Sequence, residues 1–144
     1  MPCKKINFIE EDASISFLKK KEPIKTWIKD VIKNHQHIPV KINYIFCSDE
    51  YLLEINKQYL AHDYYTDIIT FDNSEYEGEV EADIFVSIDR IKDNAKTLNE
   101  TFEREFHRVL IHGVLHLLGF KDKTEEEEIL MRANENKCLE LIGL

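Results

Sequence analysis

The sequence predicts a single α+β domain in which helices pack on a small mixed β-sheet. The chain of 144 residues has the length of one domain. Hydrophobic residues make up 43% of it, with only four Gly and three Pro, so a packed core is expected rather than disorder. Apolar periods of two and of 3.6 residues follow one another in the order β-α-β-α-β-β-α-α-α.

Four elements are predicted in the first part of the chain. Lys4 to Ile9 forms a short strand, and Glu22-Pro23 opens a helix, since proline is tolerated in a first turn. Apolar residues from Val40 to Phe46 alternate with more polar ones, which indicates a half-buried strand. Ser48 is the expected N-cap of a second helix that continues to about Tyr59.

Two strands and two helices are predicted next. The strands are Asp67 to Phe71 and Ala82 to Ile88, separated by an acidic loop from Asp72 to Glu81. Helices are expected over about Asp89 to Leu98 and about Glu100 to Leu118.

A last helix is predicted after Gly119, because glycine commonly follows the end of a helix. Thr124 and Glu127 have the spacing of a capping box at its start. The acidic run from Glu125 to Glu128 falls in the first turn of this helix, where the helix dipole favours negative charge. That run is therefore explained by the helix start.

Cysteine spacing and hydropathy predict a cytoplasmic protein. Cys3, Cys47 and Cys138 are odd in number and far apart, so neither a zinc ribbon nor a redox motif is expected. Met1 to Glu11 is charged throughout and lacks the apolar core of a signal peptide. No apolar run approaches the roughly 20 residues that cross a bilayer, so no membrane partner is expected.

The net charge of −9 argues against a polyanionic partner such as RNA, but the charge is unevenly distributed. Residues 1–41 hold nine Lys and five acids, a net of +4, whereas residues 42–120 carry −10 and residues 121–144 carry −3. The basic N-terminal part suits phosphate contacts, although solvated surface explains the same composition.

The most informative segment is IHGVLHLLGFKDK, from Ile111 to Lys123. His112 and His116 are four apart, so on a helix their imidazoles project from one face. That spacing lets two neutral nitrogens reach one ion at roughly 2.0–2.1 Å. Asp122 follows the turn at Gly119 as a third ligand, which leaves a coordination position for water.

The alternative is that two histidines share a helix face by chance. From Val109 to Leu118 every residue is apolar except His112, His116 and Gly113, and such a helix is buried. Two buried imidazoles side by side are costly unless they are hydrogen-bonded or ligated, so the metal interpretation is favoured. Gly113 stands where HExxH zinc peptidases carry their glutamate base, which disfavours a peptidase.

Several motifs resemble those of the YbeY family of RNA-cleaving enzymes. HGVLHLLGF, beginning at His112, resembles the family signature HGxLHLxG followed by an aromatic residue. Thr66 to Phe71 (TDIITF) resembles the family segment TDVLSF, and Asp83-Ile84 resembles its Gly-Asp-Ile. Order and spacing correspond over about residues 40–142, and the combined motifs are far more specific than HxxxH alone.

The resemblance implies a zinc-dependent hydrolase with a zincin-like fold over residues 1–144. Its implied activity is single-strand-specific endoribonuclease cleavage in rRNA maturation, especially at the 3′ end of the small-subunit RNA, and in ribosome quality control. The implied partners are ribosomal RNA and the small ribosomal subunit or its assembly factors. The implied cofactor is one Zn²⁺ per chain, with another divalent transition metal as the alternative.

Two positions depart from the family pattern. Asp122 stands where the family has a third histidine, which lowers the net charge of the site by one and should make a bound water less acidic. Leu60 stands where the family carries an arginine thought to contact phosphate. His62 is a nearby candidate for that role, and an exposed loop histidine is the alternative.

The expected metal ligands are His112, His116 and Asp122, and the expected catalytic residues are the same two histidines with Asp67. Asp67 is assigned to proton transfer or to supporting a metal ligand, and a plain strand-end carboxylate is the alternative. His107 has a weaker claim, since five residues before His112 it should point away from the ligands as a solvated or capping residue.

Three further side chains are weaker candidates. Asp83 begins a predicted strand, and its role is unassigned. Tyr64 and Tyr65 fall in a predicted loop, where aromatic rings either stack on single-stranded bases or simply pack.

Two other function classes stay open. One is a metallopeptidase or other zinc hydrolase, disfavoured by Gly113. The other is a ribosome-binding factor whose metal is mainly structural. Peptide hydrolysis would support the first, and ribosome assembly by a folded His112→Ala variant would support the second.

Overall fold

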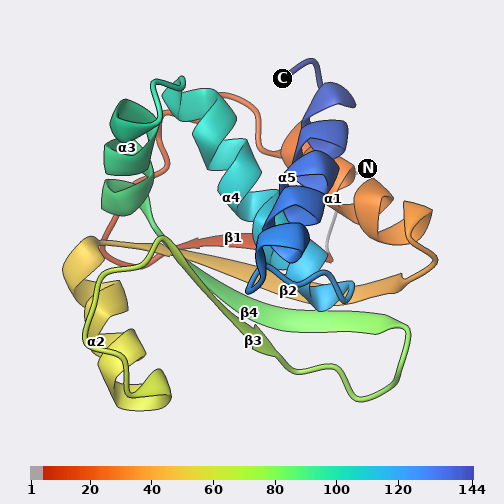
Figure 1. The fold of residues 1–144 in the computed structure, drawn as a ribbon, viewed down its shortest axis with the longest axis horizontal. Coiled ribbons are helices and arrows are strands. Elements are labelled where there is room, and N and C mark those ends of the chain that lie inside the picture. The colour runs from red at the N-terminus through yellow and green to blue at the C-terminus, as the bar shows by residue number, and fades with distance from the viewer. Residues whose placement is uncertain (1–4) are drawn as a thin grey trace.

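The computed structural model describes residues 5–144, and its elements follow one another in the predicted order. Figure 1 shows the helices gathered around one small sheet. The elements are β1 (Ile6–Glu10), α1 (Glu22–Asn34), β2 (Ile38–Cys47), α2 (Asp49–Leu60), β3 (Ile68–Asp72), β4 (Glu79–Ser87), α3 (Ile88–Thr97), α4 (Phe102–Leu117) and α5 (Glu125–Glu140).

The four strands form a mixed sheet in the order β1-β2-β4-β3. β1, β2 and β4 are parallel, and β3 is antiparallel to β4 at the edge. The parallel connections run through helices, and the antiparallel pair is joined by a short hairpin. The predicted α+β class with a small mixed sheet is therefore confirmed.

Two apolar clusters lie on the two faces of the sheet. The larger joins the strands to α1, α4 and α5, which Figure 1 shows in front of and beside the sheet. The smaller packs Leu52 and Ile55 of α2 on Cys47 and Ile69. α4 is the central helix of the larger cluster, and the buried Tyr44 hydroxyl donates a hydrogen bond to the Leu110 carbonyl at 2.9 Å.

Helix caps agree with the sequence analysis. The hydroxyl of Ser48 accepts from the amide of Tyr51 at the start of α2. Thr124 and Glu127 form the predicted capping box, so the acidic run occupies the first turn of α5. Gly119 follows α4 with a positive φ of 105°, a conformation that glycine adopts without a Cβ clash.

Three local expectations need correction or restriction. β4 begins at Glu79, so the acidic segment is shorter than predicted: Val80 is fully buried and continues the strand alternation. Val40 is exposed because the register shifts between Pro39 and Lys41, which moves it off the buried face. Cys3 and Lys4, which the sequence analysis placed in a thiol count and a first strand, lie outside the described residues.

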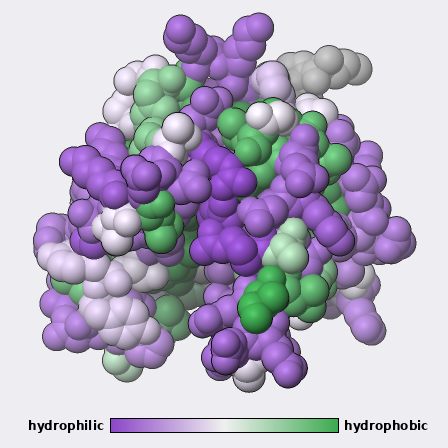
Figure 2. Space-filling model, turned by 45° about the horizontal axis from the view of Figure 1, so that its top comes forward, coloured by the Kyte–Doolittle hydropathy of each residue, from purple (hydrophilic) through white to green (hydrophobic). Residues whose placement is uncertain are grey.

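The surface shows no broad apolar area in the view of Figure 2. That face is largely hydrophilic, and its hydrophobic side chains form small separate groups. Within residues 5–144, no helix is both long and apolar enough to cross a membrane.

Candidate metal centre

The C-terminal half of α4 carries His112 and His116 one turn apart, with ring centroids separated by 4.5 Å. After Leu117 the chain turns at Gly119 and runs back past the end of the helix. This return brings the Asp122 carboxylate to the two imidazoles. The structure therefore brings together the three residues that the sequence analysis assigned as ligands.

Three atoms converge on one point. The Nε2 atoms of His112 and His116 are 3.0 Å apart. Oδ2 of Asp122 lies 3.2 Å from Nε2 of His116 and 3.3 Å from Nε2 of His112. A tetrahedral ion with bonds of roughly 2.0–2.1 Å holds its ligand atoms about 3.3 Å apart. The group consequently has the dimensions of a divalent-metal site.

Hydrogen bonds made by the Nδ1 atoms of His112 and His116 determine that their Nε2 atoms face the centre. Nδ1 of His116 lies 3.0 Å from the Phe120 carbonyl, which can only accept a hydrogen bond. Nδ1 of His112 lies 2.7 Å from a carboxylate oxygen of Glu135. Both Nδ1 atoms therefore carry the hydrogen, and both Nε2 atoms present lone pairs. Two lone pairs and a carboxylate oxygen meeting at 3.0–3.3 Å repel one another unless a cation lies between them.

Glu135 of α5 contacts a candidate ligand, and the sequence analysis did not identify it. It is 4% exposed, and besides His112 it pairs with Arg108 at 3.0 Å. Carboxylates of this kind orient a metal-binding imidazole and make it a better ligand. The sequence did contain a signal for Glu135. Met131, Glu135 and Cys138 lie on the same buried face of α5, and a carboxylate between two apolar residues on a buried face is unusual.

In the His112–Glu135 pair, the hydrogen bond and the opposite charges set the direction of both pKa shifts. Burial opposes protonation of His112, but the hydrogen bond and charge of Glu135 outweigh it and raise the pKa of His112. Burial likewise favours neutral Glu135, yet the hydrogen bond and charge of His112, with Arg108, hold the pKa of Glu135 below its usual range. Glu135 is thus a carboxylate at neutral pH and accepts the Nδ1 hydrogen.

Asp67 lies beside this centre. Two cavities, of about 590 and 740 Å³, meet there, and both are lined by Asp67, His112 and Asp122. Burial raises the pKa of Asp67, and the nearby His112 moderates the rise. One Asp67 oxygen accepts from the Asn94 amide at 3.3 Å. A carboxyl with a raised pKa that lines the metal cavities is suited to proton transfer.

Of the weaker candidates between α2 and β3, some line the cavity of 740 Å³ and one does not. Leu60, His62 and Tyr64 line it together with His112 and Asp122. Tyr65 is held elsewhere, with its hydroxyl donating to Glu50 and its ring against Arg90.

Asp83 and His107 lie outside both metal-centre cavities. Asp83 accepts amide hydrogen bonds from Asn43 and Asn73 and lines a groove next to α2. His107 points away from the ligands as expected, but the expectation that it is solvated is wrong. It is 7% exposed because it packs against Trp27, and its Nδ1 donates to the Glu103 carbonyl at 2.6 Å.

Position 113 faces the sheet rather than the ligands. A Cβ built on Gly113 would lie 2.8 Å from Cδ1 of Ile68 and 3.1 Å from Oγ1 of Thr70. The glycine lets α4 approach β3 closely, so that the imidazoles stand next to the segment that carries Asp67. A glutamate side chain at this position would meet β3.

Comparison with known proteins agrees with the motifs and the fold. A family model described as Endoribonuclease YbeY matches residues 5–143. Endoribonuclease YbeY of Cytophaga hutchinsonii is 53% identical over 136 residues, covering 94% of this chain and 94% of that protein. Endoribonuclease YbeY of Phocaeicola vulgatus is 47% identical over 139 residues, covering 96% of this chain and 99% of that protein. A solution structure of a Thermotoga maritima protein is similar with a TM-score of 0.64 and 32% identity, covering 94% of this chain and 87% of that one. This chain belongs to the YbeY endoribonuclease family.

Proposed function

We propose that the chain is a zinc-dependent endoribonuclease that cleaves single-stranded RNA, with residues 1–144 acting as one catalytic domain. Its place is in rRNA maturation, at the 3′ end of the small-subunit RNA, and in ribosome quality control in the cytoplasm. The small ribosomal subunit or its assembly factors present the substrate. Membership of the YbeY family supports the reaction class.

The observation that carries the proposal is the triangle of ligand atoms with edges of 3.0, 3.2 and 3.3 Å. Two neutral imidazoles and one carboxylate are a donor set that zinc accepts, and three protein ligands leave a position for substrate or water. The ligands are also partly exposed, at 23% for His112 and 37% for Asp122, so a phosphodiester can approach.

Each protein group has a defined part. His112, His116 and Asp122 hold the ion, which when bound supplies Lewis-acid polarisation of a phosphoryl oxygen. Glu135 keeps the Nδ1 hydrogen on His112 and fixes the ring direction. Asp67 exchanges a proton with the reacting water or 2′-hydroxyl from its place on the shared wall of the two cavities.

The test is metal content and RNA cleavage in the same preparations. Protein purified without a histidine tag is expected to carry about one zinc per chain and to cut a single-stranded rRNA fragment. His116→Ala and Asp122→Ala should lose both properties. His37→Ala is the matched control, because His37 is bonded to the His35 carbonyl and lies outside the metal group.

Three other results would contradict parts of this proposal. Metal retained in Asp122→Ala alone would show that Asp122 is not a ligand. Metal lost together with unchanged ribosome assembly in folded His112→Ala would replace catalysis by a binding role. Cleavage of peptides instead of RNA would overturn the substrate assignment. The lack of space for a glutamate at position 113 argues against such peptidase activity.

A further inference from the structure

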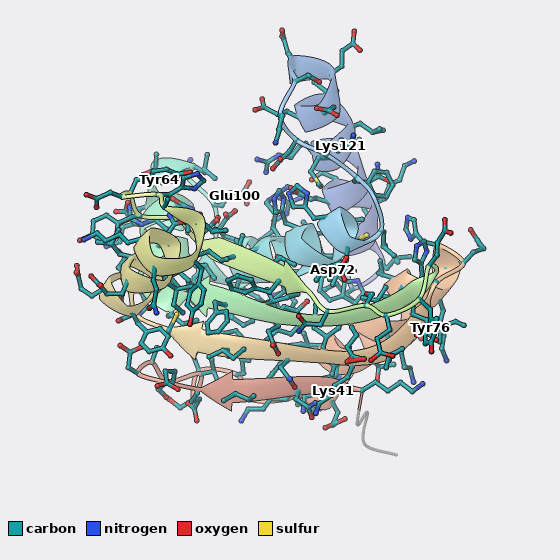
Figure 3. The ribbon with its side chains drawn as sticks, turned by 90° about the horizontal axis from the view of Figure 1, so that it is seen from below. Lys41, Tyr64, Asp72, Tyr76, Glu100 and Lys121 are labelled. Carbon is teal, nitrogen blue, oxygen red and sulfur yellow. The ribbon has the colours of Figure 1, made fainter. Side chains whose placement is uncertain are left out.

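The loop between α2 and β3 forms part of the wall of the metal cavity. Leu60, His62, Tyr64 and Thr66 line the cavity of about 740 Å³ that also contains the three ligands. This volume lies within the roughly 300–1,000 Å³ of typical ligand sites. Figure 3 shows Tyr64 on this loop and Lys121 on the loop before α5, well apart from each other.

A buried side chain holds this loop in place. Asn56 is 1% exposed, and its amide nitrogen donates to the Tyr64 carbonyl at 2.9 Å. The main-chain carbonyl of Asn56 accepts from the backbone amide of His62 at 3.0 Å. Ala61, the residue directly after α2, has a left-handed conformation that starts the turn. The loop is thus hydrogen-bonded to Asn56 at His62 and at Tyr64, two of the residues that line the cavity.

The two anchored residues form an exposed aromatic stack. The imidazole of His62 and the ring of Tyr64 have centroids 5.1 Å apart and planes inclined by only 20°. The Tyr64 hydroxyl also lies 2.9 Å from Nδ1 of His62, which holds the two rings in register. Tyr64 remains 56% exposed, so the pair does not serve to fill the core.

The side chain of Tyr65, the next residue, is held by contacts within the protein. Tyr65 is 45% exposed, but its hydroxyl donates to Glu50 and its ring lies 5.1 Å from the Arg90 guanidinium. Its ring is therefore engaged in contacts within the protein and is absent from the cavity lining. Of these adjacent tyrosines, Tyr64 is the one that lines the same cavity as the three candidate ligands.

We propose that the His62–Tyr64 pair is a base-stacking subsite that binds one nucleobase of a single-stranded RNA next to the scissile phosphate. The inference rests on the proposed nuclease function and specifies how that site holds its substrate. A flat aromatic pair with a free face extends its stack by one base, whatever the base, because every base has a π-face. The subsite positions the strand without selecting its sequence, while Lys123, on the same cavity wall, is available to a phosphate.

The experiment measures binding by fluorescence anisotropy with a 2′-O-methyl single-stranded oligonucleotide, which cannot be cut by 2′-hydroxyl attack, and zinc-loaded protein. Loss of one base–aromatic stack weakens affinity about 5- to 150-fold, so Tyr64→Ala should show a loss in that range. Tyr64→Phe keeps the π-face and loses only the hydrogen bond to His62, so it should retain most of the affinity. Tyr64→Leu should bind as weakly as the alanine variant, since it keeps bulk but has no π-face.

Two matched controls separate this site from general surface effects. Tyr65→Ala and Tyr59→Ala remove tyrosines that are exposed by 45% and 64% but lie outside the cavity, and both should bind normally. Thermal unfolding of every variant checks that the loop change leaves the fold intact.

An abasic scan identifies the stacked base. Oligonucleotides with one abasic position each are compared on wild type and Tyr64→Ala. At the stacked position, removing the base should weaken wild type and have no further effect on the variant, which is the coupling expected for two groups in contact. Additive effects at every position, or normal binding by Tyr64→Ala, would overturn the subsite. Wild type that neither binds nor cleaves RNA would instead overturn the proposed function itself.

Discussion

Nδ1 of His112 lies 2.7 Å from a carboxylate oxygen of Glu135, a residue 23 positions further along the chain. Glu135 is also paired with Arg108 at 3.0 Å, so its carboxylate is buried without being left uncompensated. The contact joins α4, which carries two ligands, to α5, which carries none. The direction of the metal-facing nitrogen therefore depends on how these two helices pack.

Replacing this carboxylate should weaken metal binding without unfolding the protein. In Glu135→Gln the side chain keeps its size but loses the negative charge that favours the Nδ1 hydrogen, and zinc affinity should fall roughly 10- to 100-fold. Competition with a chromophoric chelator measures this. Glu140→Gln, an exposed change on the same helix, should leave affinity unchanged. Equal affinities for Glu135→Gln and wild type would remove Glu135 from the site.

Asp67 should matter for the rate and not for metal content. Asp67→Asn removes a carboxyl that can exchange a proton but keeps its shape, and cleavage should slow by about 10²- to 10⁴-fold. Single-turnover RNA cleavage and zinc content are measured on the same sample. Asp63→Asn, whose side chain is 82% exposed and pairs with Lys57, is the control and should cleave normally. Loss of zinc in Asp67→Asn would assign it a structural role at the ligands.

Gly113 should tolerate alanine better than a larger residue. The alanine Cβ meets the flexible end of Ile68, and helix propensity favours Ala over Gly by about 1 kcal/mol, so the free energy of unfolding should change by less than about 1 kcal/mol. Gly113→Leu should lower it by about 1–3 kcal/mol, because Thr70 and Ile68 leave no room. Urea denaturation measures both. A neutral leucine variant would show that α4 can move away from β3.

Two thiols should resist alkylation in the folded protein. Burial, with the charges of Asp12 and Glu11, raises the pKa of Cys47 to about 12, and burial raises that of Cys138 to about 11. At pH 8 neither forms the reactive thiolate, so iodoacetamide should label both only after unfolding, as peptide mass spectrometry would show. Rapid labelling of native Cys47 would contradict its burial.

The same thiols add a pH dependence to stability. Their folded pKa values lie above the roughly 8.5 of an exposed thiol. Their contribution to the free energy of unfolding is complete below about pH 8.5 and is lost as the pH rises towards 11 and 12. The decline between pH 7.5 and 10 should be smaller in Cys47→Ala than in wild type.

Local patterns in the sequence determined most of the fold. The order of nine elements, the caps at Ser48 and Thr124, and the turn at Gly119 all follow from rules that involve residues within one or two turns of each other. The spacing of His112 and His116 belongs to the same class, since helix geometry alone places residues four apart on one face. The start of β4 and the exposure of Val40 were missed because sheet register, not local composition, decides them.

Only the tertiary structure decided which further side chains lie beside the three candidate ligands. Glu135 reaches His112 because α5 packs on α4, and Asp67 lies beside it because Gly113 lets α4 approach β3. Tyr64 and Tyr65 are adjacent and chemically identical, yet Asn56 directs one toward the cavity while Glu50 and Arg90 hold the other away. Periodicity specifies the face of an element on which a residue lies. Contacts between residues far apart in the chain depend on how whole elements pack, and no local pattern encodes that packing.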